Sequence, residues 1–338
     1  MAIILPANHF AHQYLTSQNL PVVSSAANQD AAATRRCVTL GFVNVMPTEY
    51  LEETVNLLLA RLARAPYDVK PVFISPEGKD CKGVSWERAR AEKPDCLLIT
   101  GYAASNLPFE ELDFWPALQT IIKDAEQASL PLLGVCAGAM AVAYASYGIQ
   151  KEQAPHKLLG NYEYTTDTGA HLYLATSRNN TLNRVQLLET VAQGHLHVAA
   201  QTHDTPQPEP AVLTDPRRDW VLTLAHLEYA YTTRNDYPDF EGQALHILDY
   251  QYRRDHNQQS PKYDPALAAR VLPPVHLTLN PAQVKAREDY AESLMAAWIA
   301  RAYTRKCALQ NGPVREHHSR VEGARRQAHY PAASPGGF

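Results

Sequence analysis

The first half of the chain alternates short apolar runs with stretches in which apolar residues recur at helical spacing. The apolar runs predict strands at residues 37–44, 68–74, 95–100 and 132–135. The periodic stretches predict helices over residues 50–64 and 115–129, and a further helix directly after residue 136. Strands that alternate with helices are typical of parallel sheets covered on both faces. The chain is therefore predicted to be an α/β protein with a doubly wound parallel sheet.

The pattern changes beyond residue 150. Short strands or hairpin arms are predicted at residues 162–166, 171–175 and 195–199. A hairpin is predicted from residues 211–214 and 220–225, which flank the turn-like segment Asp215-Pro-Arg-Arg-Asp219. Residues 240–254 and 284–302 are predicted helices, and the Pro-rich residues 263–281 between them an irregular connection. The parallel sheet is thus expected to carry extra β-hairpins and C-terminal helices.

The two ends of the chain differ from its middle. Residues 1–36 are polar, rich in Ala, Ser, Asn and Gln, and show few periodic signals, so they are predicted to form an N-terminal arm outside the core. Residues 305–338 are basic, rich in His, and end in Ala-Ala-Ser-Pro-Gly-Gly-Phe, which predicts a disordered tail. Residues 37–304 remain as one folded domain.

Composition and charge narrow the range of functions. The chain has 338 residues, 45% of them hydrophobic, which is enough for a sizeable core. A formal net charge of −4 gives no electrostatic reason to expect nucleic acid or an anionic membrane as partner. No apolar run is long enough to span a bilayer, and no basic segment precedes the apolar residues at the N-terminus. Small-molecule chemistry in the cytoplasm is expected.

The cysteines give a consistent picture. There are five, they are scattered, and none forms a Cys-x-x-Cys pair. Neither a disulfide framework nor a metal site is therefore expected, and a reducing compartment fits best. We also expect no bound cofactor.

One cysteine has a distinctive setting. Cys136 follows the apolar run 132–135, lies between Gly134 and Gly138, and precedes good helix-forming residues. A sharp strand-to-helix turn of this kind lifts its central residue above the sheet. A helix N-terminus lowers the pKa of a thiol and stabilises a developing oxyanion. The commoner fate of a single cysteine is burial in the core, but the flanking glycines favour a nucleophile.

A base is expected from His226-Leu227-Glu228. In an extended segment residues two apart point the same way, so the carboxylate of Glu228 can orient the imidazole of His226 while Leu227 points into the core. Most of the 14 histidines are expected to be surface or structural residues. His226 differs because it follows an apolar strand, as Cys136 does, and the ends of parallel strands converge at one edge of a sheet.

These motifs resemble known families. Gly134-x-Cys136-x-Gly138 with a later His226-x-Glu228 resembles the class I glutamine amidotransferase-like fold, a flavodoxin-like sheet with a Cys-His-Glu triad. Further segments resemble the homoserine O-acyltransferases (homoserine O-succinyltransferase family) of methionine synthesis. Residues 43–47 are similar to that family's Leu-Asn-Leu-Met-Pro, and residues 100–116 to its Thr-Gly-Ala-Pro with a downstream Tyr-Trp-Pro. Residues 157–163 are similar to its Lys-Leu-x-Gly-x-Tyr-Glu, residues 226–229 to its His-Pro-Glu-Tyr, and residues 250–255 to its Glu-Phe-Phe-Arg-Asp.

The resemblance implies a ping-pong acyltransferase. Cys136 would take the acyl group from an acyl-CoA, succinyl-CoA or acetyl-CoA, and pass it to the hydroxyl of an amino acid, with His226 as base and then acid and Glu228 orienting it. The oxyanion would be held by the N–H of Ala137 and by an N–H of the loop from Tyr102 to Ala104, which we assign to Ala104. A homodimer is also expected.

Three further residues acquire a role only through the resemblance. Arg254 matches an arginine for the acceptor carboxylate, and Lys157 matches a lysine near the acceptor pocket; plain surface charge is the alternative for both.

Ser105 falls where the family has glycine with succinyl-CoA and glutamate with acetyl-CoA. A glutamate would fill the space for a succinyl tail and repel its carboxylate, so the small, uncharged Ser105 predicts succinyl-CoA as donor.

The sequence also departs from the family pattern. Met46-Pro47-Thr48-Glu49 stands where the family has Met-Pro-Lys-Lys, and Gln251, or Tyr250 if the register shifts by one, replaces a glutamate expected near the acceptor ammonium. The acceptor is therefore left as homoserine or a related hydroxy amino acid such as serine. A glutaminase or hydrolase, and a binding protein without activity on the same scaffold, remain as alternatives.

Overall fold

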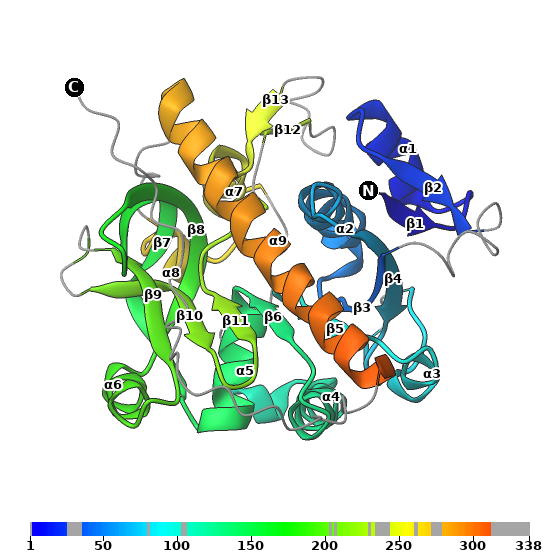
Figure 1. The fold of residues 1–338 in the computed structure, drawn as a ribbon. Helices are drawn as coiled ribbons and strands as arrows, with labels where there is room; N and C mark the ends of the chain where they lie inside the picture. Colours follow the sequence, from blue (N-terminus) through cyan, green and yellow to red (C-terminus); the bar gives the residue numbers. More distant parts are fainter. Residues whose placement is uncertain are drawn as a thin grey trace, which may run out of the picture.

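The computed structural model describes residues 2–25, 36–79, 82–102, 107–202, 205, 208–228, 231–233, 244–259, 263–271 and 279–311 (Figure 1). In this part of the chain one large sheet contains eleven strands. They are β1 (Ile3–Leu5), β2 (Val22–Ser24), β3 (Cys37–Val43), β4 (Asp68–Ile74), β5 (Cys96–Ile99), β6 (Leu132–Val135), β7 (Lys151–Thr166), β8 (His171–Leu182), β9 (His197–Thr202), β10 (Glu209–Asp215) and β11 (Trp220–Thr223).

The strand order is β2-β1-β4-β3-β5-β6-β11-β10-β9-β7-β8. Every pairing from β2 to β11 is parallel, and every pairing from β11 to β8 is antiparallel. The prediction of a doubly wound, flavodoxin-like parallel sheet with added hairpins is confirmed. The hairpin expected around Asp215–Asp219 is the β10–β11 pair.

Helices cover both faces of the sheet (Figure 1). They are α1 (Phe10–Ser17), α2 (Thr48–Leu62), α3 (Trp86–Ala91), α4 (Trp115–Gln127), α5 (Ala137–Tyr147), α6 (Arg184–Ala192), α7 (Ile247–His256), α8 (Pro265–Ala268) and α9 (Pro281–Asn311). Residues of α1, α2 and α9 share one hydrophobic cluster with the sheet, and residues of α3 to α6 share the other. Within the described residues, no helix is both long and apolar enough to cross a membrane.

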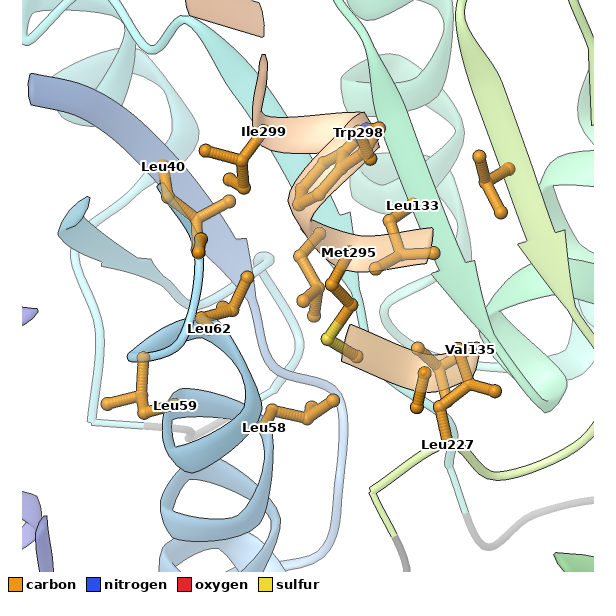
Figure 2. Close-up of a cluster of buried hydrophobic side chains, with 14 of the residues drawn as sticks. Leu40, Leu58, Leu59, Leu62, Leu133, Val135, Leu227, Met295, Trp298 and Ile299 are labelled. Carbon is orange, nitrogen blue, oxygen red and sulfur yellow. The ribbon is translucent and has the colours of Figure 1, made fainter. Parts of the chain in front are cut away.

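The cluster under α2 and α9 shows how the strands divide their side chains between the two faces. Leu133 of β6 packs on this side, together with Met295 and Trp298 of α9 (Figure 2), whereas its neighbour Leu132 belongs to the opposite cluster. Leu58 of α2 belongs to the same cluster. Alternate residues of a strand point to opposite faces, so a continuous apolar run is what a sheet covered on both sides requires.

The prediction of an N-terminal arm outside the core is wrong. β1 pairs in parallel with both β2 and β4, and so extends the sheet at one edge. Ile3 and Leu5 are fully buried, and Asp68 accepts a hydrogen bond from the N–H of Ala2 at 2.7 Å. Strands of three residues are too short to display a period in the sequence, which is why the polar composition of the whole segment concealed them.

The C-terminal elements also differ from their predicted bounds. α9 continues to Asn311, so the folded part does not end at residue 304, and residues 312–338 lie outside the described residues. α7 begins later than predicted because residues 244–246 form β13 (Ala244–His246), which pairs with β12 (Tyr231–Thr233) in a second, two-stranded sheet. α8 lies within the connection predicted to be irregular.

Candidate active site

Cys136 lies between the end of β6 and the start of α5, as the strand-turn-helix pattern predicts. Its backbone has φ of 51° and ψ of −116°, a positive-φ conformation that residues other than glycine rarely adopt. The N–H of Cys136 donates a 2.7 Å hydrogen bond to the carbonyl of Thr223 on β11, which holds the turn in place. Strain of this kind, maintained by surrounding contacts, is typical of functional turns.

The flanking glycines are required by close backbone contacts. A Cβ on Gly138 would lie 2.3 Å from the carbonyl oxygen of Thr100, and one on Gly134 would lie 2.8 Å from the Cα of Ala139. Real Cβ atoms essentially never come within 3.0 Å of such neighbours. The first turn of α5 therefore packs closely against β6, the strand that precedes it, and against the end of β5.

His226 is brought to Cys136 by strand pairing. β11 lies parallel to β6 with Thr223 opposite Val135, so the residues after each strand emerge at the same edge of the sheet. The N–H of His226 donates a 2.7 Å hydrogen bond to the carbonyl of Ala175 on β8, which fixes the backbone there. The ends of β6 and β11 therefore meet at one edge of the sheet, as expected from the sequence.

The carboxylate of Glu228 lies against the imidazole of His226. Its Oε1 lies 2.7 Å from Nδ1 of His226, and both side chains are buried. Leu227 between them is buried in the hydrophobic cluster beneath α9 (Figure 2), as the alternation of an extended segment predicts. Because Nδ1 faces the carboxylate, the other ring nitrogen is the one that can exchange a proton with Cys136.

The charges around the thiol favour the thiolate. Burial raises the pKa of Cys136, but the charge of His226, its hydrogen bond to the sulfur and the charge of Arg178 outweigh this, so the pKa of Cys136 is lowered. Burial lowers the pKa of His226, whereas Glu228 and then Cys136 raise the pKa of this imidazole to about 10. Each change favours a thiolate–imidazolium pair, the reactive form of a cysteine nucleophile.

Two segments surround the position where an oxyanion would develop. The N–H of Ala137 is at the first residue of α5, where helix N–H groups lack partners within the helix. The chain after β5 lies beside it, since a Cβ on Gly101 would be 3.4 Å from Cβ of Cys136 and 3.8 Å from N of Ala137. Ala104, assigned as the second donor, and Ser105 both lie outside the described residues.

A cavity of about 180 Å³ opens over Cys136, His226 and Glu228. Its walls come from α2, the chain after β5, the turn at Cys136, β7, β8 and α7. The β8 wall, residues 177–180, was not identified from the sequence, which predicted a strand only as far as residue 175. The carbonyl oxygen of Ser177 in this wall lies 3.9 Å from the Cys136 sulfur.

Lys157 lines this cavity and is buried, so the alternative of plain surface charge is wrong for this residue. Its ammonium forms an ion pair with the equally buried Asp255 of α7. Arg254 lies in α7, and its side chain is outside the described residues. The Lys157–Asp255 pair thus links β7 to the helix that carries Arg254 and the cavity-lining residue Gln251.

In the described part of the chain, no group of three or more His, Cys, Asp or Glu side chains is arranged to hold a metal ion.

A sequence model of the homoserine O-succinyltransferase family matches residues 2–272, which is most of the chain. The chain belongs to this family. Family membership makes it a homoserine O-acyltransferase-type enzyme, in agreement with the resemblance of its motifs.

The individual relatives of this chain are distant from it in sequence. The homoserine O-acetyltransferase of Streptococcus pneumoniae is 26% identical over 275 residues, covering 74% of this chain and 84% of that protein. The homoserine O-acetyltransferase of Novosphingobium aromaticivorans is 28% identical over 265 residues, covering 72% and 85%. Among solved structures, a glutamine amidotransferase from Methylobacillus flagellatus is similar, with 13% identity, a TM-score of 0.43, and coverage of 89% of this chain and 94% of that chain.

Proposed function

We propose that the protein transfers an acyl group from an acyl-CoA to the hydroxyl of homoserine or a related hydroxy amino acid such as serine, through a thioester on Cys136. The observation that carries the proposal is the shared cavity of Cys136, His226 and Glu228, in which the thiol pKa is lowered and Nδ1 of His226 lies 2.7 Å from a buried carboxylate. Such an arrangement suits acyl transfer by a cysteine nucleophile.

In the first half-reaction the thiolate of Cys136 attacks the thioester carbonyl of the donor. The negative charge that develops on the carbonyl oxygen is stabilised by the N–H of Ala137 and by the proposed donor at Ala104. The bond to CoA breaks, the leaving thiolate takes the proton of the His226 imidazolium, and CoA departs as a thiol. The acyl group remains on Cys136, and His226 is neutral.

In the second half-reaction neutral His226 accepts the proton of the acceptor hydroxyl. The oxygen attacks the acyl carbonyl, the bond to the Cys136 sulfur breaks, and an O-acyl ester is released. The enzyme returns to the thiolate–imidazolium pair that its charges favour. Glu228 keeps one tautomer and stabilises the imidazolium in both steps.

We propose succinyl-CoA as the donor, because Ser105 is small and uncharged at the position where the family distinguishes succinyl from acetyl donors. The curated relatives named above are acetyltransferases, so the comparison of the two donors is the critical one. Arg254 is proposed to bind the acceptor carboxylate, with Lys157 beside it. From the family we further propose a role in methionine synthesis, and from the scattered cysteines a cytoplasmic location.

The test is a panel of succinyl-CoA and acetyl-CoA, each with homoserine and serine, with glutamine alone as the control for a glutaminase. The proposal expects CoA release only when an acyl-CoA and a hydroxy amino acid are both present, and formation of the corresponding ester. Ammonia release from glutamine without acyl transfer would show that the protein is a glutaminase instead. No turnover of any pair would contradict an acyltransferase role.

A further inference from the structure

Arg178 is a buried cation in the wall of the cavity over Cys136. It lies on β8, is 4% exposed, and lines the same cavity as the nucleophile. Its Nη2 donates to Oε2 of Glu209 at 3.0 Å and to the carbonyl of Pro210 at 3.4 Å. Its Nε and Nη1 are buried and have no hydrogen-bond partner among the described residues.

A guanidinium group carries five N–H donors, and buried donors in proteins are almost always hydrogen-bonded, so two buried nitrogens without an acceptor are unusual. The carboxylate of Glu209 lies toward the surface, with 19% of its side chain exposed, and the same oxygen also accepts a 2.6 Å hydrogen bond from Thr181. Within the part of the chain that the structure describes, Glu209 pairs with one end of the guanidinium, and Nε and Nη1 are left without an acceptor. Lys157, another buried cation of the cavity wall, differs because Asp255 beside it is equally buried.

Arg178 also lies close to the reacting atoms. The preceding residue, Ser177, places its carbonyl oxygen 3.9 Å from the Cys136 sulfur. Two residues earlier, the carbonyl of Ala175 holds the backbone N–H of His226. β8 therefore runs along the Cys136–His226 pair, and the charge of Arg178 is felt at the thiol, where it lowers the pKa of Cys136.

We propose that Arg178 is a specificity-determining residue whose remaining guanidinium N–H groups bind a carboxylate of the substrate. This inference rests on the proposed acyl transfer. A carboxylate supplies the missing acceptors in a charge-assisted contact. Two substrates could supply it: the distal carboxylate of a dicarboxylic acyl group on Cys136, or the α-carboxylate of the acceptor amino acid, which Arg178 would then bind together with Arg254.

Binding is tested first without turnover, by the rate at which iodoacetamide alkylates Cys136. Succinate and homoserine are the carboxylate probes, and succinamide is the neutral control. In the parent we expect at least one carboxylate probe to slow alkylation saturably, and succinamide to have no effect at the same concentration. Arg178→Gln should weaken that protection by at least tenfold.

Two variants control this measurement. Arg184→Gln removes an exposed arginine at the start of α6 that donates to the carbonyl of Pro208 and does not line the cavity, so its protection should match the parent. Arg178→Lys keeps the charge without the planar group and should retain part of the protection, which also guards against misfolding of Arg178→Gln. Undiminished protection in folded Arg178→Gln, or equal protection by succinamide, would overturn the proposal.

Steady-state kinetics then identify the carboxylate. A rise in KM for the acceptor with both donors in Arg178→Gln assigns the α-carboxylate. A loss of kcat/KM for succinyl-CoA without a comparable loss for acetyl-CoA assigns the acyl carboxylate. A fall in kcat alone, with both KM values and the donor preference unchanged, would show a structural role and contradict the proposal. Should no acyl transfer occur with any pair, the proposed function fails, while protection of Cys136 still reports on Arg178.

Discussion

Gly138→Ala should damage the site through a single methyl group. The new Cβ would lie 2.3 Å from the carbonyl oxygen of Thr100 and 2.7 Å from that of Ile99, both backbone atoms that no side-chain rotation can move. Reaching the 3.0 Å limit for real Cβ contacts requires a displacement of about 0.7 Å (3.0 − 2.3) between the start of α5 and the end of β5. Overpacking of this kind costs roughly 1–3 kcal/mol of folding free energy.

The same displacement separates Cys136 and Ala137 from the segment proposed to complete the oxyanion site. Because a misplacement of about 1 Å at a reacting centre can cost on the order of 100-fold in rate, we expect kcat/KM for acyl transfer to fall by roughly that factor. Urea unfolding followed by circular dichroism gives the stability, and CoA release gives the rate.

Gly148→Ala at the other end of α5 is the matched control. Gly148 has φ of +70°, and a Cβ added there would have no described atom within 4 Å, so alanine costs about 1–2 kcal/mol through backbone strain alone. This variant should lose stability and keep the parental rate. A Gly138→Ala protein with parental stability and rate would refute the packing argument for the turn.

Three other expectations follow from the same geometry, and a fourth from the proposed donor. Cys136 should be alkylated at neutral pH ahead of Cys37, whose pKa is raised by burial, and equal labelling would contradict the lowered pKa of the nucleophile. His226→Ala should be nearly inactive and should move the alkylation profile of Cys136 to higher pH, because His226 lowers that pKa; an unchanged profile would place the base elsewhere. Glu228→Gln should retain measurable activity, reduced about 10- to 100-fold by loss of a charge-assisted hydrogen bond worth roughly 1.5–3 kcal/mol. Ser105→Glu should shift donor preference from succinyl-CoA toward acetyl-CoA, and an unchanged preference would show that this position does not select the donor.

The residues most visible in the sequence are those whose signal is local. Cys136 could be found because its glycines and the adjoining strand and helix lie within a few positions, and both glycines have backbone contacts closer than a Cβ allows. His226 and Glu228 could be found because a parallel strand precedes them and a period of two aligns them. The parallel sheet was predictable for the same reason, since β5 and β6 at its centre are continuous apolar runs.

The β8 wall was not predictable in this way. Arg178 and its neighbours are polar residues in the second half of an antiparallel strand, and their place beside Cys136 depends on how β8 crosses the end of β11 rather than on any local pattern. β1 escaped detection because three apolar residues carry no period, although the sheet pairs them on both sides. The positions of β1 and of the β8 wall both depend on pairing between segments that are far apart in the sequence.

The central claim is that Cys136 carries the acyl group, and mass spectrometry of the acylated protein tests it most directly. The protein is mixed with succinyl-CoA in the absence of acceptor, quenched in acid, and digested to locate the modification. We expect one succinyl group on the peptide that contains Cys136 and none in Cys136→Ser. When unreacted succinyl-CoA is removed and homoserine is then added before the quench, the succinyl group should disappear from Cys136 and O-succinylhomoserine should form in equal amount. A protein that forms the ester while Cys136 remains unmodified, or that forms it equally well as Cys136→Ser, would contradict the account.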